Sequence, residues 1–333
     1  MKKLISKDLN NIILGSSILS TGGGLKFTEQ KKLIKKIKSI FLSNSLLTNK
    51  SVLIPLEIGA ANIPLVTNKQ LIKKLFKETN LISQIKAIMP AEMGQESIAF
   101  LASSISSLPL LDIDLAGGRA APRLPINIFS ANEIPFAVKE IIAINSQHQL
   151  EKISNIANIF QAEKILRNIA VKNQGSCFIA FIIKINRSIQ KIITREHTLT
   201  TSLLLGKKIG QNNNFQKLNP KSVISGTIDK VISGNQSGFS QKIIKIISPN
   251  GKVFKIINEN ENLLLLSESK LLAQAPEIIT LFDPKLKRGL HCSELKMGQK
   301  IKILVFNSIK SWRTKKGVKL WNQFALNKLN LNL

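Results

Sequence analysis

Three short apolar segments, each ending in carboxylates and glycines, decide the fold of the first half of this chain. They are Ile54-Pro55-Leu56-Glu57-Ile58-Gly59, Ile88-Met89-Pro90-Ala91-Glu92-Met93-Gly94 and Leu110-Leu111-Asp112-Ile113-Asp114-Leu115-Ala116-Gly117-Gly118-Arg119-Ala120. Short apolar runs separated by helical patterns are typical of strands in a layered α/β domain. In open α/β sheets, ligands bind just beyond the carboxyl ends of the strands. The acids and the arginine therefore predict a functional site at one edge of an N-terminal sheet.

The length and composition favour two folded domains. The chain has 333 residues, of which 44% are hydrophobic and 20% are charged, so each half can bury a core. We expect an α/β domain with a mixed or parallel sheet and helices over residues 1–172, carrying the site. We expect a β-rich C-terminal domain over residues 173–333, with one long helix near 188–210.

Helix caps, apolar spacing and turn residues predict the individual elements. In the first half the expected helices and strands are helices 6–20, 28–40, 68–78, 96–106 and 150–170 and strands 51–56, 85–89, 110–114 and 127–130. A strongly apolar strand is expected at 177–185. Beyond residue 214 short strands follow, and Asn250-Gly251 predicts the turn of a hairpin formed by residues 242–257.

The formal net charge of +28 allows two interpretations. One is a polyanionic partner, either nucleic acid or an anionic membrane surface. The other is a drift in composition, which we favour because lysines are spread along the whole chain. Aromatic residues make up only 5% of the sequence, so it offers little stacking surface for single-stranded nucleic acid. We expect nucleic acid to bind only nonspecifically, through net charge.

Cysteine usage and hydropathy indicate a cytoplasmic protein. Cys177 and Cys292 form no disulfide framework and no zinc spacing, and no apolar run reaches the length of a membrane span. The glycine run at Gly22-Gly23-Gly24 lacks the Gly-Lys-Ser/Thr ending of a phosphate-binding loop. We therefore expect neither a membrane partner nor a bound nucleotide.

Four carboxylates are candidate site residues. Asp112 and Asp114 lie two residues apart, so on an extended strand they share one face and could act as a general acid or bind a divalent metal together with Glu92. They could equally cap a helix and brace a loop. Glu92 is a candidate general base or metal ligand, or else a partner for the dipole of the following helix. Glu57 occupies the matching position on the first strand.

Arg119 and the glycine run are candidates for holding negative charge. The guanidinium of Arg119 can bind a carboxylate or oxyanion, or can form a salt bridge with Asp112 or Asp114. Gly22, Gly23 and Gly24 could present backbone N–H groups to an anion, or simply end a helix.

An ordered set of motifs extends along nearly the whole chain. Its main members are Thr21-Gly22-Gly23-Gly24, Pro90-Ala91-Glu92-Met93-Gly94, Asp112-Ile113-Asp114, Gly118-Arg119-Ala120-Ala121-Pro122, Asn260-Glu261-Asn262-Leu263 and Ala275-Pro276-Glu277-Ile278-Ile279. With this set the chain resembles the S-methyl thiohydantoin desulfurase domain proteins, which are associated with hydantoinases and oxoprolinases.

The resemblance implies a hydrolase acting on a small cyclic amide, such as a thiohydantoin or hydantoin ring. Water would attack the ring carbon that bears the S-methyl group and expel methanethiol. Glu92 or Asp114 would activate this water, and Arg119 with the glycine loop would stabilise developing negative charge. A hydantoinase or oxoprolinase partner and a homo-oligomer are also expected.

The chain differs from the family's usual motifs at Gln95, Glu96 and Arg123, the last standing where a glutamate is usual. These differences favour an alternative, a catalytically inactive accessory or ligand-binding subunit of a hydantoinase-type system. A third hypothesis, a nucleic-acid-associated basic protein, is supported only by the charge.

Overall fold

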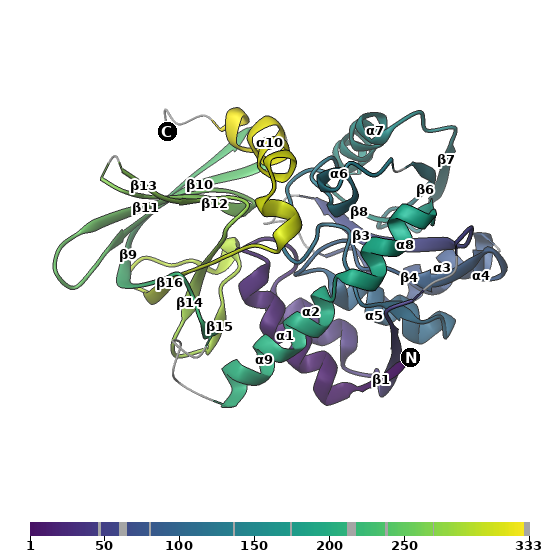
Figure 1. Cartoon of the computed structure of the whole chain (residues 1–333), viewed down its shortest axis with the longest axis horizontal. Coiled ribbons are helices and arrows are strands. Elements are labelled where there is room, and N and C mark those ends of the chain that lie inside the picture. The colour runs from purple at the N-terminus through teal and green to yellow at the C-terminus, as the bar shows by residue number, and fades with distance from the viewer. Residues whose placement is uncertain are drawn as a thin grey trace.

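The computed structural model contains two eight-stranded sheets with helices around the first of them (Figure 1). The residues that it describes are 1–45, 48–59, 65–79, 81–135, 137–173, 175–211, 218–236, 239–268 and 270–329. None of the helices in these ranges has the length and apolar composition that a membrane span requires.

The first sheet is mixed and contains the three segments that opened the sequence. Its strands, in spatial order, are β1 (Lys2–Ile5), β2 (Ser39–Ser43), β5 (Leu110–Leu111), β4 (Ile85–Ile88), β3 (Ser51–Gly59), β8 (Ser176–Lys184), β6 (Val138–Ile144) and β7 (Leu150–Ser154). Strands β2, β5, β4 and β3 are parallel, and the remaining pairs are antiparallel. The carboxyl ends of β3, β4 and β5 therefore meet at one edge, as predicted.

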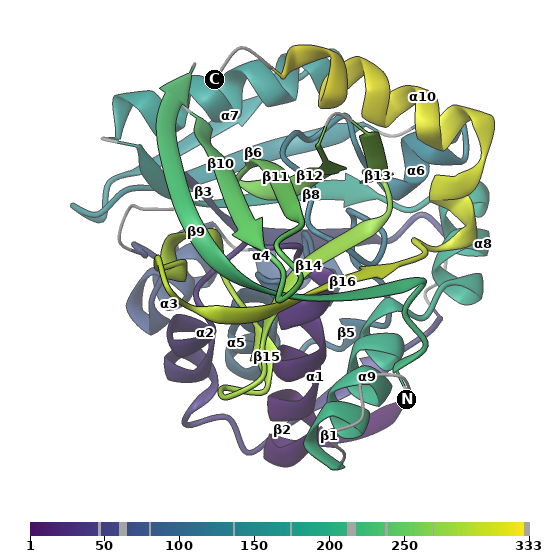
Figure 2. The same ribbon diagram turned by 90° about the vertical axis from the view of Figure 1, so that its left-hand side faces the viewer.

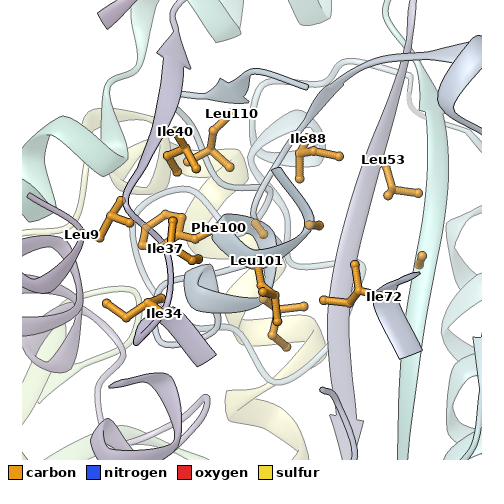
Figure 3. Packing of buried hydrophobic residues seen from close by; sticks show 14 of the residues in the cluster. Leu9, Ile34, Ile37, Ile40, Leu53, Ile72, Ile88, Phe100, Leu101 and Leu110 are labelled. Carbon is orange, nitrogen blue, oxygen red and sulfur yellow. The ribbon is translucent and has the colours of Figure 1, made fainter. Parts of the chain in front are cut away.

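Side chains of the central strands alternate between two cores. On β8, Phe178 and Ala180 face one core, whereas Ile179 and Phe181 face the other, because successive strand residues point to opposite sides. Figure 3 shows the first core, in which residues from the helices and strands interdigitate. This burial on both faces explains why β8 is continuously apolar.

Helices cover both faces of the first sheet. Helices α1, α2, α3 and α5 contribute to the first core, and α6, α7 and α8 contribute to the second. The helices are α1 (Ser6–Leu19), α2 (Phe27–Ile34), α3 (Lys69–Thr79), α4 (Leu81–Gln84), α5 (Glu96–Ser106), α6 (Ile128–Ala131), α7 (Ile159–Lys172), α8 (Arg187–Arg195), α9 (Thr198–Gln211) and α10 (Lys315–Phe324).

The second sheet is antiparallel throughout. In spatial order it contains β13 (Lys270–Gln274), β12 (Glu261–Ser267), β11 (Val253–Glu259), β10 (Phe239–Ile247), β9 (Ser222–Gln236), β16 (Lys300–Phe306), β14 (Ile278–Asp283) and β15 (Arg288–Gly289). Figure 2 views the molecule from the side of this sheet, with the long, curved β9 in front. The predicted hairpin is confirmed as β10 and β11, and Gly251 in its turn has φ +81°. The predicted fold class, an α/β region followed by a β-rich part, is confirmed.

The first sheet continues past residue 172, where we expected the second domain to begin. Strand β8 pairs with both β3 and β6, and the second sheet begins only at Ser222. A division at 172 separates β8 from the sheet to which it belongs, because strand pairing joins segments that are distant in sequence.

Five predicted elements differ from the structure. The expected strand 127–130 is the helix α6, because the Asn127 side chain accepts the N–H of Ser130 as a helix cap. The expected helix 188–210 is two helices, α8 and α9, interrupted at Glu196 and His197. Helix 28–40 ends at Ile34, since the following residues form β2 between β1 and β5.

The other two differences concern the residues of β7 and the end of β5. The expected helix 150–170 begins only at Ile159, after an Asn158 cap, because residues 150–154 pair with β6 as β7. The expected strand 110–114 stops at Leu111. Beyond it, the Asp112 carboxylate turns toward the start of α9.

Two glycines allow α1 and α9 to cross in contact. A Cβ added to Gly15 would lie 1.9 Å from the Ser202 carbonyl oxygen, and one added to Gly206 would lie 1.8 Å from the Asn11 carbonyl oxygen. Only hydrogen fits at these positions. The crossing holds α9, and with it the residues at its N-terminus, against α1.

We expect Gly206→Ala to lower the free energy of unfolding by about 1–3 kcal/mol, because the added methyl group must push the two helices apart. Gly210→Ala is the matched control on α9, where an added Cβ meets no atom of the described residues within 4 Å. That change should instead stabilise the helix by about 0.5–1 kcal/mol. Urea unfolding measures both values, and equal effects in the two variants would contradict the proposed contact.

Candidate active site at the junction of the two sheets

A cavity of about 130 Å³ lies where the carboxyl edge of the first sheet meets the second sheet. Its walls come from β3, from the loops that follow β4 and β5, from α7 and from the start of β12. The ionisable side chains that line it are those of Glu29, Glu57, Glu92, Arg123, Glu163, Arg167, Glu261 and His291. The cavity has room for one small ring.

Glu92 lines this cavity with its carboxylate held in place. Its Oε2 accepts the Ala121 N–H at 3.0 Å, and its Oε1 accepts from Gln95 Nε2 at 2.8 Å. Burial raises the pKa of Glu92 to about 7, against the opposing effects of these hydrogen bonds and of the Arg167 and Arg119 charges. Part of the side chain remains accessible to water. Glu92 can therefore exchange a proton near neutral pH.

Glu261, the first residue of β12, faces the same cavity from the second sheet. Its side chain is 3% exposed, and its Oε2 has no hydrogen-bond partner among the described residues. Burial and the nearby Glu92 charge raise the pKa of Glu261 well above its ordinary value, although the Arg119 charge opposes them. Burial and the nearby negative charge thus both favour the protonated form of Glu261.

The glycine run brings Glu261 to this position. The Thr21 carbonyl accepts the Asn262 N–H at 2.7 Å, and the Gly22 carbonyl accepts the Cys292 N–H at 2.8 Å. A Cβ on Gly23 would lie 2.3 Å from Glu261 Oε1, so the carboxyl group packs directly on this glycine. The second sheet thus docks on the bare backbone of the loop.

The N–H groups of the loop are only partly available for an anion, the role that we predicted for them. The Gly23 N–H donates to the Ser20 carbonyl at 2.8 Å. Gly24 lines the cavity, and its carbonyl accepts from His291 Nε2 at 3.1 Å. Burial lowers the pKa of His291 to about 4, so this ring is neutral near pH 7.

Glu57 lines the cavity but is occupied by protein donors. It accepts the N–H groups of Val66 and Thr67 at 2.9 and 3.0 Å, and also the hydroxyl groups of Thr67 and Ser176. Burial raises its pKa despite these bonds. Its geometry suits holding the wall of the cavity rather than proton transfer.

Asp112 and Asp114 do not line the cavity. Asp112 accepts the Thr200 N–H at 2.8 Å and the Thr200 hydroxyl at 2.6 Å, and it contacts His197 Nδ1 at 3.2 Å, so it caps α9. Asp114 Oδ1 accepts the Gly118 N–H at 2.7 Å. Of the two roles considered from the sequence, this placement favours helix capping and loop bracing.

The predicted metal ligands are consequently not assembled. Within the described ranges, no group of three or more His, Cys, Asp or Glu side chains is placed to hold a metal ion. The carboxylates of Asp112 and Asp114 turn toward backbone donors, whereas Glu92 faces the cavity.

Arg119 is buried behind the cavity rather than within it. Its Nη1 donates to the Glu277 carbonyl at 2.9 Å, its Nε donates to the Ala120 carbonyl at 3.0 Å, and its guanidinium lies 4.0 Å from the centre of the Trp321 ring. Burial lowers its pKa to about 9. From this position its charge favours the ionised forms of Glu92 and Glu261, so Arg119 is a positioning residue.

The three residues that differ from the family motifs have different positions relative to the cavity. Gln95 lines the cavity and links two site residues, because its Oε1 accepts the Glu57 N–H at 2.8 Å while its Nε2 donates to Glu92. Arg123 also lines the cavity and pairs with Glu259 at 2.8 Å. Glu96 lies outside it and accepts the Gly94 N–H and the Ser16 hydroxyl.

Sequence reasoning did not select Glu261, Glu163 or Arg167 as site residues. Glu261 stands within the motif Asn260-Glu261-Asn262, which was a usable signal. Glu163 and Arg167 form an i,i+4 ion pair on α7 at 2.8 Å. Such a pair is indistinguishable in sequence from an ordinary surface pair on a helix.

The buried carboxylates make stability depend on pH. Burial raises the pKa of Asp114 from its ordinary value of 3.8 to about 7. At a pH between these two values folding takes up a proton, so the free energy of unfolding falls as the pH rises through this range to about 7. We expect Asp114→Asn to reduce the loss of stability between about pH 5 and about pH 8 by up to a few kcal/mol. Glu133→Gln is the control, because the Glu133 carboxylate is exposed. Urea unfolding curves that respond to pH equally in Asp114→Asn and wild type would contradict this.

Comparisons with known proteins agree with the resemblance seen in the sequence. Residues 7–147 match the S-Me-THD-like N-terminal domain, and residues 157–327 match the S-Me-THD-like C-terminal domain. An X-ray structure of a protein from Chromobacterium violaceum has the same fold, with a TM-score of 0.71 at 14% identity, covering 99% of this chain and 98% of that one. No curated protein matches. The predicted family is thereby confirmed, and the chain belongs to the S-Me-THD-like proteins, the S-methyl thiohydantoin desulfurase domain family.

Proposed function

We propose that this protein hydrolyses a thiohydantoin-type cyclic amide in the cavity at the junction of the two sheets, replacing the S-methyl group with oxygen. The observation that carries the proposal is that Glu92 and Glu261 line the same small cavity, where burial raises the pKa of Glu92 to about 7 and raises the pKa of Glu261 well above its ordinary value. A general base and a general acid thus face one small cavity. Family membership supports the reaction class.

The reaction balances with these two groups alone. Glu92 accepts a proton from water as the water oxygen bonds to the ring carbon, while Glu261 donates its proton to the adjacent ring nitrogen. In the second step the C–S bond breaks and the carbonyl forms. Glu261 recovers a proton from the new hydroxyl group, and Glu92 gives its proton to the methanethiolate. Both side chains return to their initial states.

The surrounding residues support this proton transfer. Gln95 and the Ala121 N–H orient the Glu92 carboxylate, and Arg119 limits the rise of both carboxyl pKa values. Removing Arg119 would leave Glu92 protonated at higher pH. Because Glu261 is buried and Glu92 is partly buried, their charges interact more strongly than in water.

A second candidate is a ligand-binding accessory subunit of a hydantoinase-type system. The observation that favours it is Arg123, which places a cation on the cavity wall where a family glutamate is usual and pairs with Glu259. Such a protein would bind a cyclic amide without releasing methanethiol.

Methanethiol release from S-methyl thiohydantoins, followed with a thiol reagent, tests the catalytic proposal. We expect Glu92→Gln and Glu261→Gln each to lower kcat by about 100-fold or more, because each removes one proton-transfer group. The wild-type rate should rise through about pH 7 as Glu92 ionises. Glu151→Gln, an exposed change on β7, should leave the rate unchanged.

The outcomes separate the hypotheses. Loss of activity in Asp114→Asn with full activity in Glu261→Gln would return the chemistry to the residues predicted from the sequence. No methanethiol release from the wild type, together with a rise in Tm on adding the cyclic amide, would support the accessory subunit.

Gly23→Ala tests the placement of Glu261 without removing any ionisable group. The added methyl group would meet Glu261 Oε1 at 2.3 Å and must displace the carboxyl group. We expect kcat to fall by about 10-fold or more, because the general acid is then no longer held in position. Far-UV circular dichroism verifies the fold, and wild-type kcat in a folded Gly23→Ala protein would show that this position of Glu261 is not needed.

A further inference from the structure

A second hollow lies on the first domain, outside the carboxylate cavity. It has a volume of about 760 Å³ and lies among α2, α3 and α5. This volume is within the range of about 300–1,000 Å³ that is typical of small-molecule sites. We call it the lysine groove, after the residues of its rim.

The floor of the lysine groove is apolar. It consists of Leu33, Ile37, Leu101 and Ile105, together with Leu65 at one end. Ile37 and Leu101 are buried members of the core shown in Figure 3, so this part of the floor belongs to the packed core. An apolar ligand body could therefore pack against a surface that is already formed.

The rim of the groove is cationic. Five lysines line it, all exposed, from α2 and the turn that follows it and from α3: Lys32, Lys35, Lys36, Lys69 and Lys73. Among the described residues, none of the five has a carboxylate within ion-pair distance. The only acid that lines the groove in the described ranges is Glu29, whose carboxylate accepts the Lys26 N–H at the start of α2.

We propose that the lysine groove binds an anionic amphiphile, a small molecule with an apolar body and a carboxylate or phosphate head. The apolar body would cover the leucine and isoleucine floor, and the head would neutralise the repulsion among the rim lysines. Such a ligand matches both properties of the groove, whereas a neutral apolar molecule matches only one. This proposal does not depend on the reaction proposed above.

The groove adjoins the carboxylate cavity. Glu29 and Leu65 line both hollows. Thr67, which lines the groove, also donates its N–H and hydroxyl to Glu57 in the cavity wall. A ligand in the groove would therefore lie next to the wall of the carboxylate cavity.

Fluorescence titration with 1-anilinonaphthalene-8-sulfonate tests the proposal, since this probe combines an apolar body with one negative charge. We expect the doubly substituted Lys35→Glu/Lys73→Glu protein to bind it about 10-fold or more weakly than the wild type does, and the wild-type affinity to fall between about 50 and about 500 mM salt. The neutral analogue N-phenyl-1-naphthylamine should bind the wild type more weakly than the sulfonate does.

The matched control is Lys255→Glu/Lys270→Glu, which makes the same change in net charge at exposed positions on the second sheet. It should retain wild-type affinity. An equal loss of affinity in this control would show that net charge alone attracts the probe, and that result would overturn the proposal. Unchanged binding in Lys35→Glu/Lys73→Glu would also overturn it. Circular dichroism of both variants verifies that they are folded.

Competition then identifies the head group. Decanoate and decyl phosphate are added separately to the probe complex, and the better competitor distinguishes a carboxylate from a phosphate ligand. Decanol provides the comparison for the apolar chain alone. Displacement by decanol as strong as by both anions would overturn the role of the lysines.

Discussion

The contact between the glycine loop and the start of β12 is the constraint on which the site depends. Gly22 and Gly24 have φ values of +89° and +75°, which side chains rarely adopt, and Gly23 leaves no space for a Cβ beside Glu261. The backbone of the loop can therefore meet the second sheet directly. The hydrogen bonds from the Asn262 and Cys292 N–H groups to this loop hold the second sheet against it. Without this close approach, Glu261 would not face the cavity that contains Glu92.

Burial at this junction determines the proton distribution. A carboxylate removed from water loses hydration, so the neutral form is favoured unless cations or hydrogen-bond donors compensate. Two hydrogen-bond donors and the charges of Arg119 and Arg167 stabilise the ionised form of Glu92. In contrast, Glu261 Oε2 has no hydrogen-bond partner among the described residues. The two carboxyl groups therefore have different surroundings, although burial raises the pKa of both. The stacking of Arg119 on Trp321 connects this balance to α10, at the far end of the sequence.

Much of the fold could be predicted because its signals are local. The helix at Glu96–Ser106 has the predicted limits, the Asn250-Gly251 turn joins β10 and β11, and parallel strands carry Glu57 and Glu92 to one edge. Several of the predictions that differ concern segments whose partners are remote. Residues 39–43 became β2 through pairing with β1 and β5, and β8 joined the first sheet through pairing with β3. For the same reason the direction of the Asp112 carboxylate was decided by α9, which follows it by more than eighty residues.

Residue types at short spacing were enough to predict the strand edge, the glycine loop and the family. Which carboxylates share a cavity depends instead on how the two sheets pack together. It placed Asp112, Asp114 and Arg119 in capping, bracing and stacking contacts, and it brought Glu261 opposite Glu92 from another sheet. A side chain is positioned by the donors and surfaces that pack around it, and here those belong to segments far apart along the chain.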